Sequence, residues 1–192
     1  AVSISFAAVE LAKKIFGELE DRTVMLIGAG EMAELAARHL VTCGVRRVIV
    51  ANRTFEKAAI LASTFQGQAV SFEELEERLE SADIVISSTG APGVIIEKKM
   101  VQRILKRRRH RPMFFIDIAV PRDIDPAVNG IENVYAYDID DLEEVVQANI
   151  KARAQEAAKA EEIIVGEVRQ FMEWSHSRDS FPTIVKLRSW AE

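Results

Sequence analysis

Apolar residues recur along the chain in two alternating patterns, and together they predict an α/β fold. Short unbroken apolar runs predict strands covered on both faces, because a strand exposed on one face would alternate apolar and polar residues. Between these runs, apolar positions three or four residues apart predict amphipathic helices. Strands separated by helices of about 10–13 residues form βαβ units. The predicted fold class is therefore α/β, a doubly wound parallel sheet followed by a long C-terminal helix.

Six strands and five shorter helices are expected before the long helix. The predicted strands are 23–27, 47–51, 68–70, 84–87, 113–118 and 134–137. The predicted helices are 5–19, 31–43, 55–65, 72–79 and 97–107. Ser5 is the expected N-cap of the first helix. Cys43, in apolar surroundings near the end of the second, is expected to be a buried and inert thiol.

The long helix is predicted to begin at Asp140 and Asp141, whose charges favour a helix N-terminus. A stripe with a mean spacing of about 3.6 residues follows, made of Leu142, Val146, Ile150, Ala157, Ala160, Ile164, Val168 and Phe171. A helix of about 33 residues would be roughly 50 Å long, which exceeds the width of the preceding domain. We expect the stripe to pair with a second copy of the chain, and folding back is the alternative. Residues 181–190 predict the start of another helix.

The most informative motif is the turn Gly28-Ala29-Gly30-Glu31-Met32-Ala33, which fits G-x-G-x-x-[GA]. It follows a predicted strand and opens a predicted helix, which is the context that a dinucleotide-binding turn requires. The first glycine permits the tight turn, the second lets the backbone approach a pyrophosphate, and the small third residue lets helix and strand pack closely. The helix N-terminus then supplies N–H groups to the phosphates. This turn makes the predicted sheet Rossmann-type.

The end of the second predicted strand favours NADP(H) over NAD(H). NAD sites usually carry a carboxylate there for the ribose 2′-hydroxyl, whereas this chain has Asn52, Arg53 and Thr54. A guanidinium can pair with a 2′-phosphate, so Arg53 is the expected specificity residue. Thr54 is also the expected N-cap of the helix that follows.

Two further strand ends are expected to reach the cofactor, because ligands of open α/β sheets lie beyond the carboxyl ends of the strands. Ser88, Thr89 and Gly90 follow the fourth strand and offer space and hydroxyl groups to a nicotinamide ribose. Ala119, after the fifth strand, is small enough to let a nicotinamide pass. Asp117 is expected in this cofactor-facing loop, and the alternative is that it only caps backbone amides.

Composition narrows the remaining possibilities. The 192 residues are 48% apolar and 29% charged with a net charge of −5, a globular balance that does not favour nucleic acid globally. No signal peptide or membrane span is expected. One cysteine fits a reducing cytoplasm, and with three scattered histidines it gives no metal site and no catalytic residue. The basic run 106–111 could meet RNA but is expected to be a solvated helix end.

Several longer motifs resemble the glutamyl-tRNA reductase family over nearly the whole chain. They are GAGEMA at 28–33, NRT at 52–54, STGAP at 88–92, DIAVPRDIDP at 117–126, SISFAAVELA at 3–12 and residues 134–164. The resemblance implies NADPH-dependent reduction of the glutamyl group on its tRNA to glutamate-1-semialdehyde, in tetrapyrrole (porphyrin and haem) biosynthesis. It also implies a nucleophilic cysteine in an N-terminal domain that this sequence does not contain, so the chain alone is expected to be inactive.

The resemblance divides the chain into a connecting helix (1–20), an NADP-binding Rossmann domain (21–139), and a long helix with the start of a helical dimerisation domain (140–192). Its implied partners are glutamyl-tRNA, bound through the missing domain, a second copy of the chain, and the aminomutase of the next pathway step. A shikimate-dehydrogenase-like NADP oxidoreductase and a non-catalytic NADP-binding regulatory module remain alternatives.

Overall fold

The computed structural model describes residues 4–179, with side chains described up to residue 175. Contacts divide the chain into two units, Ala1–Gln147 and Ala148–Glu192. The strands of the first unit are β1 Thr23–Gly28, β2 Arg47–Ala51, β3 Gln68–Val70, β4 Ile84–Ser88, β5 Met113–Asp117 and β6 Val134–Asp138. Its helices are α1 Ile4–Phe16, α2 Glu31–Thr42, α3 Phe55–Thr64, α4 Leu75–Leu79 and α5 Lys98–Arg107, with short 3₁₀ turns at Phe72–Glu74 and Pro126–Gly130.

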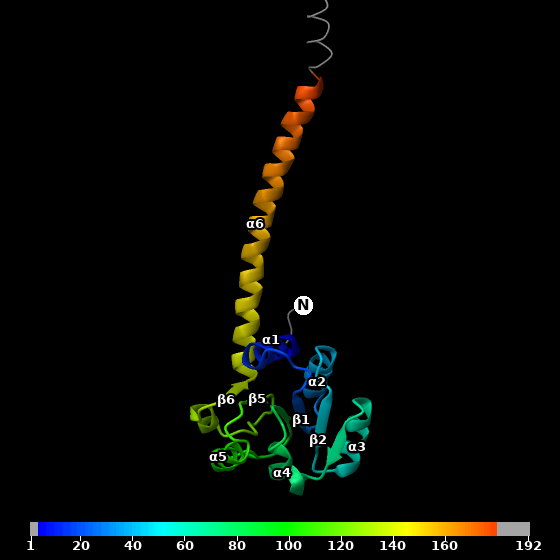
Figure 1. The fold of residues 1–192 in the computed structure, drawn as a ribbon, viewed down its shortest axis with the longest axis vertical. Coiled ribbons are helices and arrows are strands. Elements are labelled where there is room, and N and C mark those ends of the chain that lie inside the picture. The colour runs from blue at the N-terminus through cyan, green and yellow to red at the C-terminus, as the bar shows by residue number, and fades with distance from the viewer. Residues whose placement is uncertain (1–3, 180–192) are drawn as a thin grey trace, which may run out of the picture. The chain divides into compact units, whose positions relative to one another are not determined.

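The six strands form one parallel sheet in the order β3-β2-β1-β4-β5-β6 (Figure 1). This order reverses direction between β1 and β4, which is the switch point where doubly wound folds bind ligands. The predicted fold class is therefore confirmed, and the predicted strands agree with the observed ones to within one residue.

Successive side chains of each strand point to opposite faces of the sheet, and a separate apolar core lies on each face. Because both faces are buried, the strands are unbroken apolar runs in the sequence. In β1, Val24 and Leu26 join a core with α1, α2 and α3. Met25 and Ile27 face the other side, where α4 and α5 cover the sheet. Helices therefore cover both faces, as Figure 1 shows.

The first helix differs from its prediction at both ends. It already includes Ile4, so Ser5 is a buried helical residue and its prediction as N-cap is wrong. The helix ends at Phe16 because Gly17 adopts a left-handed backbone (φ +72°), which glycine does without a steric penalty. Leu19 lies beyond this end and packs into the first core.

Cys43 is exposed, so its prediction as a buried thiol is wrong. The prediction rested on the apolar surroundings of Cys43 in the sequence, and the buried face of α2 does continue up to Leu40. The helix ends at Thr42, however, and Val45 fills the core position below Leu40 instead.

The basic run 106–111 is not wholly a solvated helix end, because Arg108 is buried with a fully inaccessible side chain. One of its terminal nitrogens lies 2.7 Å from Asp83 Oδ1, and the other donates to the Glu80 carbonyl at 2.6 Å. Asp83 also accepts a hydrogen bond from the Thr23 amide at 3.0 Å. Burial lowers the pKa of Arg108, and the Asp83 carboxylate opposes this shift. The ion pair thus joins the amino ends of β1 and β4 to the end of α5.

The long helix α6, Ile139–Asp179, has 41 residues. Asp138 caps it, accepting hydrogen bonds from the amides of Asp140 and Asp141, and the Asp141 carboxylate accepts from the Asp138 amide in return. Within the first unit, Leu142 and Val146 of the predicted stripe are buried in the core. The helix predicted over 181–190 lies outside the described residues.

Candidate functional site

A cavity of about 480 Å³ opens at the carboxyl ends of β1, β2 and β4, at the switch point of the sheet. Its lining is made of Gly28, Ala29, Gly30, Asn52, Arg53, Thr54, Lys57, Phe72, Ser88, Thr89, Gly90, Ala91 and Ile95. Three short segments that are far apart in the sequence, together with Phe72, therefore meet at one edge of the sheet. Nine of these residues are among the site residues predicted from the sequence.

Four predicted site residues do not line this cavity. Glu31 and Met32 are exposed in the first turn of α2. Ala33 is buried against the sheet, as expected of the small residue that lets helix and strand approach. Ala119 is buried after β5. Their roles toward a cofactor stay predictions.

The two glycines of the turn are required by the protein itself. Gly28 has φ +96°, and a Cβ built there would lie 2.2 Å from the Ser88 carbonyl oxygen. A Cβ at Gly30 would lie 2.2 Å from Ser88 Oγ. The β1 turn and the end of β4 therefore approach so closely that a side chain at Gly28 would meet backbone and one at Gly30 would displace the Ser88 hydroxyl. Without side chains there, backbone amides are the surface offered to a ligand.

A buried carboxylate that the sequence analysis missed fixes the β4 wall of the cavity. Asp123 has no accessible surface. Its carboxylate accepts hydrogen bonds from the Ser87 hydroxyl at 2.6 Å, the Thr89 amide at 2.9 Å and the Thr89 hydroxyl at 2.6 Å. Three donors on one carboxylate compensate its burial, so Asp123 holds the segment that follows β4 in a single position.

This arrangement assigns the two predicted hydroxyls to different tasks. Thr89 donates to Asp123 and accepts from the Ala91 amide at 3.1 Å, so its proton is not available to a ribose. Ser88 Oγ has no hydrogen bond within the described residues and lies beside the Gly30 backbone. Ser88 is therefore the hydroxyl that can meet a ligand.

The end of β2 presents two cations to the cavity and no carboxylate. Arg53 and Lys57 both line it, and within the described residues neither forms an ion pair. Asn52 is engaged locally, because its side-chain oxygen accepts from the Thr54 amide at 3.1 Å. Thr54 occupies the predicted N-cap position of α3, but its side chain makes no capping hydrogen bond. Lys57, one turn into α3, was not predicted.

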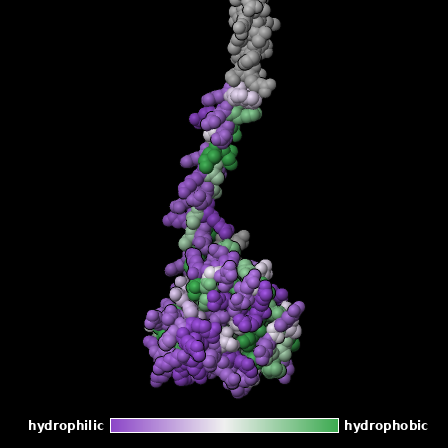
Figure 2. Space-filling model, viewed as in Figure 1, coloured by the Kyte–Doolittle hydropathy of each residue, from purple (hydrophilic) through white to green (hydrophobic). Residues whose placement is uncertain are grey.

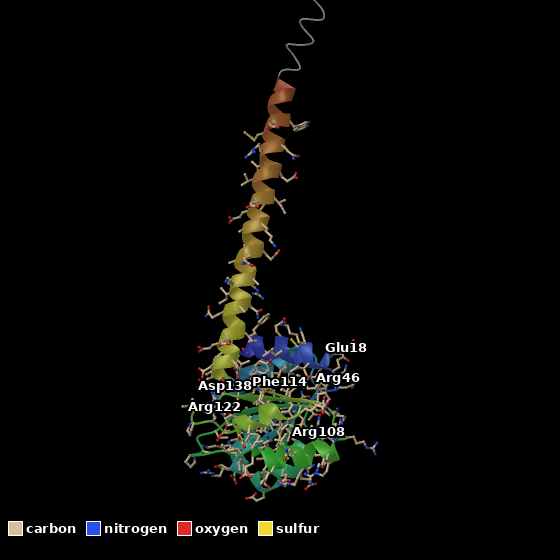
Figure 3. All side chains as sticks on the ribbon, turned by 90° about the vertical axis from the view of Figure 1, so that its left-hand side faces the viewer. Glu18, Arg46, Arg108, Phe114, Arg122 and Asp138 are labelled. Carbon is tan, nitrogen blue, oxygen red and sulfur yellow. The ribbon has the colours of Figure 1, made fainter. Side chains whose placement is uncertain are left out.

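Asp117 caps backbone amides, and its place in a cofactor-facing loop stays a prediction. It is absent from the cavity lining, and its carboxylate accepts hydrogen bonds from the Ala119 amide at 3.1 Å and the Ile124 amide at 2.9 Å. Burial raises the pKa of Asp117, and these backbone bonds oppose the rise. The loop it caps contains a cis peptide bond before Pro121 and continues to Arg122, which forms an ion pair with Asp138 (Figure 3).

The described residues offer no metal-binding group of three or more His, Cys, Asp or Glu side chains. His39 is half-buried on α2, His110 is exposed, and the side chain of His176 lies outside the described part. Among the helices described, none combines the length and apolarity that a membrane crossing needs. The lining of the cavity contains neither cysteine nor histidine.

Comparisons with known proteins agree with this geometry. The family model described as shikimate / quinate 5-dehydrogenase matches residues 10–145, and the model of the glutamyl-tRNAGlu reductase dimerisation domain matches residues 159–192. A glutamyl-tRNA reductase from Geotalea uraniireducens (strain Rf4) is 61% identical over 98% of this chain and 44% of that protein. The chain therefore spans less than half the length of the curated relatives it matches.

Solved structures show the same relationship. The glutamyl-tRNA reductase from Methanopyrus kandleri has a TM-score of 0.77 and 46% identity, covering 83% of this chain and 40% of that chain. Quinate dehydrogenase from Corynebacterium glutamicum, in complex with NAD, has a TM-score of 0.56 and 17% identity over 76% of this chain and 54% of that chain. The second likeness shows the fold alone.

Proposed function

This chain belongs to the shikimate / quinate 5-dehydrogenase family and is 61% identical to a glutamyl-tRNA reductase, and from this premise we propose that it binds NADP(H) as part of such a reductase. The observation that carries the proposal is the cavity at the switch point, where the Gly28–Gly30 turn faces Ser88. Dehydrogenases with this fold bind nicotinamide dinucleotides across this crevice.

The cations at the end of β2 support NADP(H) in particular. A 2′-phosphate near Arg53 and Lys57 would gain charge-assisted hydrogen bonds, which contribute about 1.5–3 kcal/mol when a charged group takes part. The absence of a carboxylate from the lining removes both the usual partner of the NAD ribose and a source of repulsion. NADP(H) is therefore favoured by roughly one to two decades in affinity.

In the whole protein, the proposed reaction reduces a glutamyl group carried by tRNA to glutamate-1-semialdehyde. Bound NADPH would supply the hydride for this step. The residues of this chain bind and orient the dinucleotide, and a cysteine outside this chain would hold the glutamyl group as a thioester. Cys43 is not placed for that role, because it follows the end of α2 that is remote from the Gly28–Gly30 turn and does not line the cavity.

We further propose that the second unit mediates homodimerisation. The dimerisation-domain match at residues 159–192 supports this, as does a set of exposed apolar and aromatic side chains on α6, which includes the green atoms along that helix in Figure 2. They are Ile163, Ile164, Val165, Val168, Phe171, Met172 and Trp174. Exposed apolar patches of this kind commonly mark interaction sites. Contact with the aminomutase of the next pathway step stays a prediction.

We expect Gly90→Val to weaken NADPH binding at least tenfold while leaving the fold intact. Gly90 lines the cavity, and a Cβ there meets no atom within 4 Å, so the added side chain enters open space that the ligand needs. Gly93→Val is the matched control, because a Cβ at Gly93 also meets nothing within 4 Å but Gly93 does not line the cavity. Calorimetric titration measures the affinities. Equal affinities in both variants would contradict the proposed site.

We expect Arg53→Ala to weaken NADPH binding about tenfold and NADH binding by less than about twofold. Lys57→Ala should act in the same direction, since both cations line the same part of the cavity. Lys99→Ala removes an exposed cation of α5 that lies outside the lining, and should change neither affinity. Equal losses for NADPH and NADH would reject the 2′-phosphate as the partner of Arg53.

The alternative functions differ in whether a substrate is turned over and in which one. Joining this chain to the amino-terminal part of the Geotalea uraniireducens relative should give NADPH oxidation with charged glutamate tRNA. Turnover of shikimate with NADP+ would favour the shikimate-dehydrogenase-like alternative. Dinucleotide binding without either turnover would favour a regulatory module.

A further inference from the structure

A second cavity, of about 590 Å³, lies at the amino-terminal edge of the sheet. Its lining includes the first residues of β1, β2 and β3, and it is therefore at the opposite ends of the strands from the dinucleotide cavity. Arg46, Arg47 and Arg111 line it, together with the amide side chains of Gln66 and Gln68. A neighbouring cavity of about 530 Å³ shares Arg46 and Gln66 and adds Arg38. We call this continuous surface the arginine groove; Figure 3 labels Arg46.

Three acidic residues near the arginine groove are paired with arginines. Asp83 lies in its lining, but its carboxylate is buried and bonded to Arg108 at 2.7 Å. Glu34 pairs with Arg38 at 2.6 Å and Glu20 with Arg46 at 3.1 Å. These two pairs are solvent-exposed and therefore weak, but each carboxylate offsets the charge of its arginine, so Arg47 and Arg111 carry most of the charge offered to an anion.

The other two arginines have unused donors. Arg47 gives one terminal nitrogen to the Asp21 carbonyl, and Arg111 gives Nε to the Arg108 carbonyl at 3.4 Å. Neither forms an ion pair within the described residues. A guanidinium carries five N–H donors in a fixed fork that matches phosphate oxygens. Arg47 and Arg111 can therefore each donate hydrogen bonds to a phosphate without losing their backbone contact.

The backbone beside the groove is unusual. Gln66, Arg109 and His110 have φ angles of 52°, 54° and 57°, a left-handed conformation that non-glycine residues adopt only at a cost. Gln66 and Arg109 follow the ends of α3 and α5, where glycine would adopt this conformation at a lower energetic cost. In place of glycine, the chain has the hydrogen-bond donors of the Gln66 and Arg109 side chains at these positions. The turn through Arg109 and His110 leads directly to Arg111 in the groove.

We propose that the arginine groove binds phosphate groups of an RNA backbone. Its two adjoining cavities and four arginines suit an extended polyanion, and two of these arginines, Arg47 and Arg111, form no ion pair within the described residues of a chain whose net charge is −5. The choice of RNA rests on the proposed function, because glutamyl-tRNA reductases act on an RNA-borne group. The groove would hold the tRNA away from the dinucleotide, at the opposite edge of the sheet.

The test uses fluorescence anisotropy with a fluorescein-labelled glutamate tRNA transcript and the full chain at several salt concentrations. Arg47→Gln and Arg111→Gln should each weaken binding about two- to fivefold and reduce the slope of log affinity against log salt by about one. Arg103→Gln removes an exposed arginine of α5 that pairs with Glu76 outside the groove, and it should change neither quantity. NADPH affinity should be unaffected in all three variants.

Equal losses in Arg103→Gln and in the groove variants would overturn the proposal, because they would show a nonspecific charge effect. Binding of inorganic pyrophosphate to the groove without binding of tRNA would overturn the choice of RNA. Failure of the wild-type chain to bind NADPH would instead count against the proposed function. The two failures can be told apart, because the tRNA measurement does not require NADPH binding.

Discussion

Replacing Arg108 with methionine is expected to lower the free energy of unfolding by about 3–5 kcal/mol, because removal of one partner from a buried ion pair leaves an uncompensated charge. Asp83 would remain buried with only the Thr23 amide as partner. The carbonyls of Glu80 and Pro112 would also lose their donor. Urea denaturation followed by circular dichroism measures the change.

Two further variants test this explanation. Arg107→Met changes the neighbouring residue, whose pairs with Glu76 and Glu80 are solvent-exposed, and should cost less than about 1 kcal/mol. Adding Asp83→Asn to Arg108→Met should restore part of the lost stability, because the unpaired charge disappears while Thr23 keeps its acceptor. If the double variant is no more stable than Arg108→Met, lost packing and not the stranded charge explains the effect.

Asp123→Ala is expected to weaken NADPH binding at least tenfold and to lower the free energy of unfolding by about 2–4 kcal/mol. The buried Ser87 hydroxyl and the Thr89 amide would lose their acceptor, and each unsatisfied buried donor costs about 1–3 kcal/mol. The segment that carries Ser88 would then no longer be fixed against Gly30. Calorimetric titration and thermal denaturation report the two effects separately.

The control for Asp123→Ala is Asp125→Ala, two residues along the same loop. The Asp125 carboxylate accepts a hydrogen bond from the Ala127 amide at 2.9 Å. Neither Asp123 nor Asp125 lines the dinucleotide cavity. This variant should lose some stability and keep its NADPH affinity. Unchanged NADPH affinity in Asp123→Ala would show that Asp123 supports the fold without shaping the cavity.

The sequence predicted the sheet well because each strand is buried on both faces and so reads as an unbroken apolar run. β2 and β3 have their predicted bounds, and β1, β4, β5 and β6 differ by one residue at one end. Helix ends were less predictable. The burial of Ser5 and the exposure of Cys43 depend on where a helix begins or stops against its neighbours, which local periodicity does not encode.

The candidate site was predictable where it rests on local motifs, such as the Gly28–Gly30 turn and Arg53. Residues that act through distant contacts were missed. Asp123 bonds to residues 34 and 36 positions earlier in the chain, and Arg108 pairs with a residue 25 positions away. In the sequence Arg108 looks like any member of a basic run, because only the folded chain buries it.

The exposure of Cys43 has a practical consequence. The sequence contains no other cysteine, so a maleimide spin label would attach at a single point on each chain. In an assembled pair, electron paramagnetic resonance would then read one inter-label distance without background. The same thiol can cross-link two chains on air oxidation, so sizing experiments without a reducing agent would count covalent pairs as helix-mediated ones.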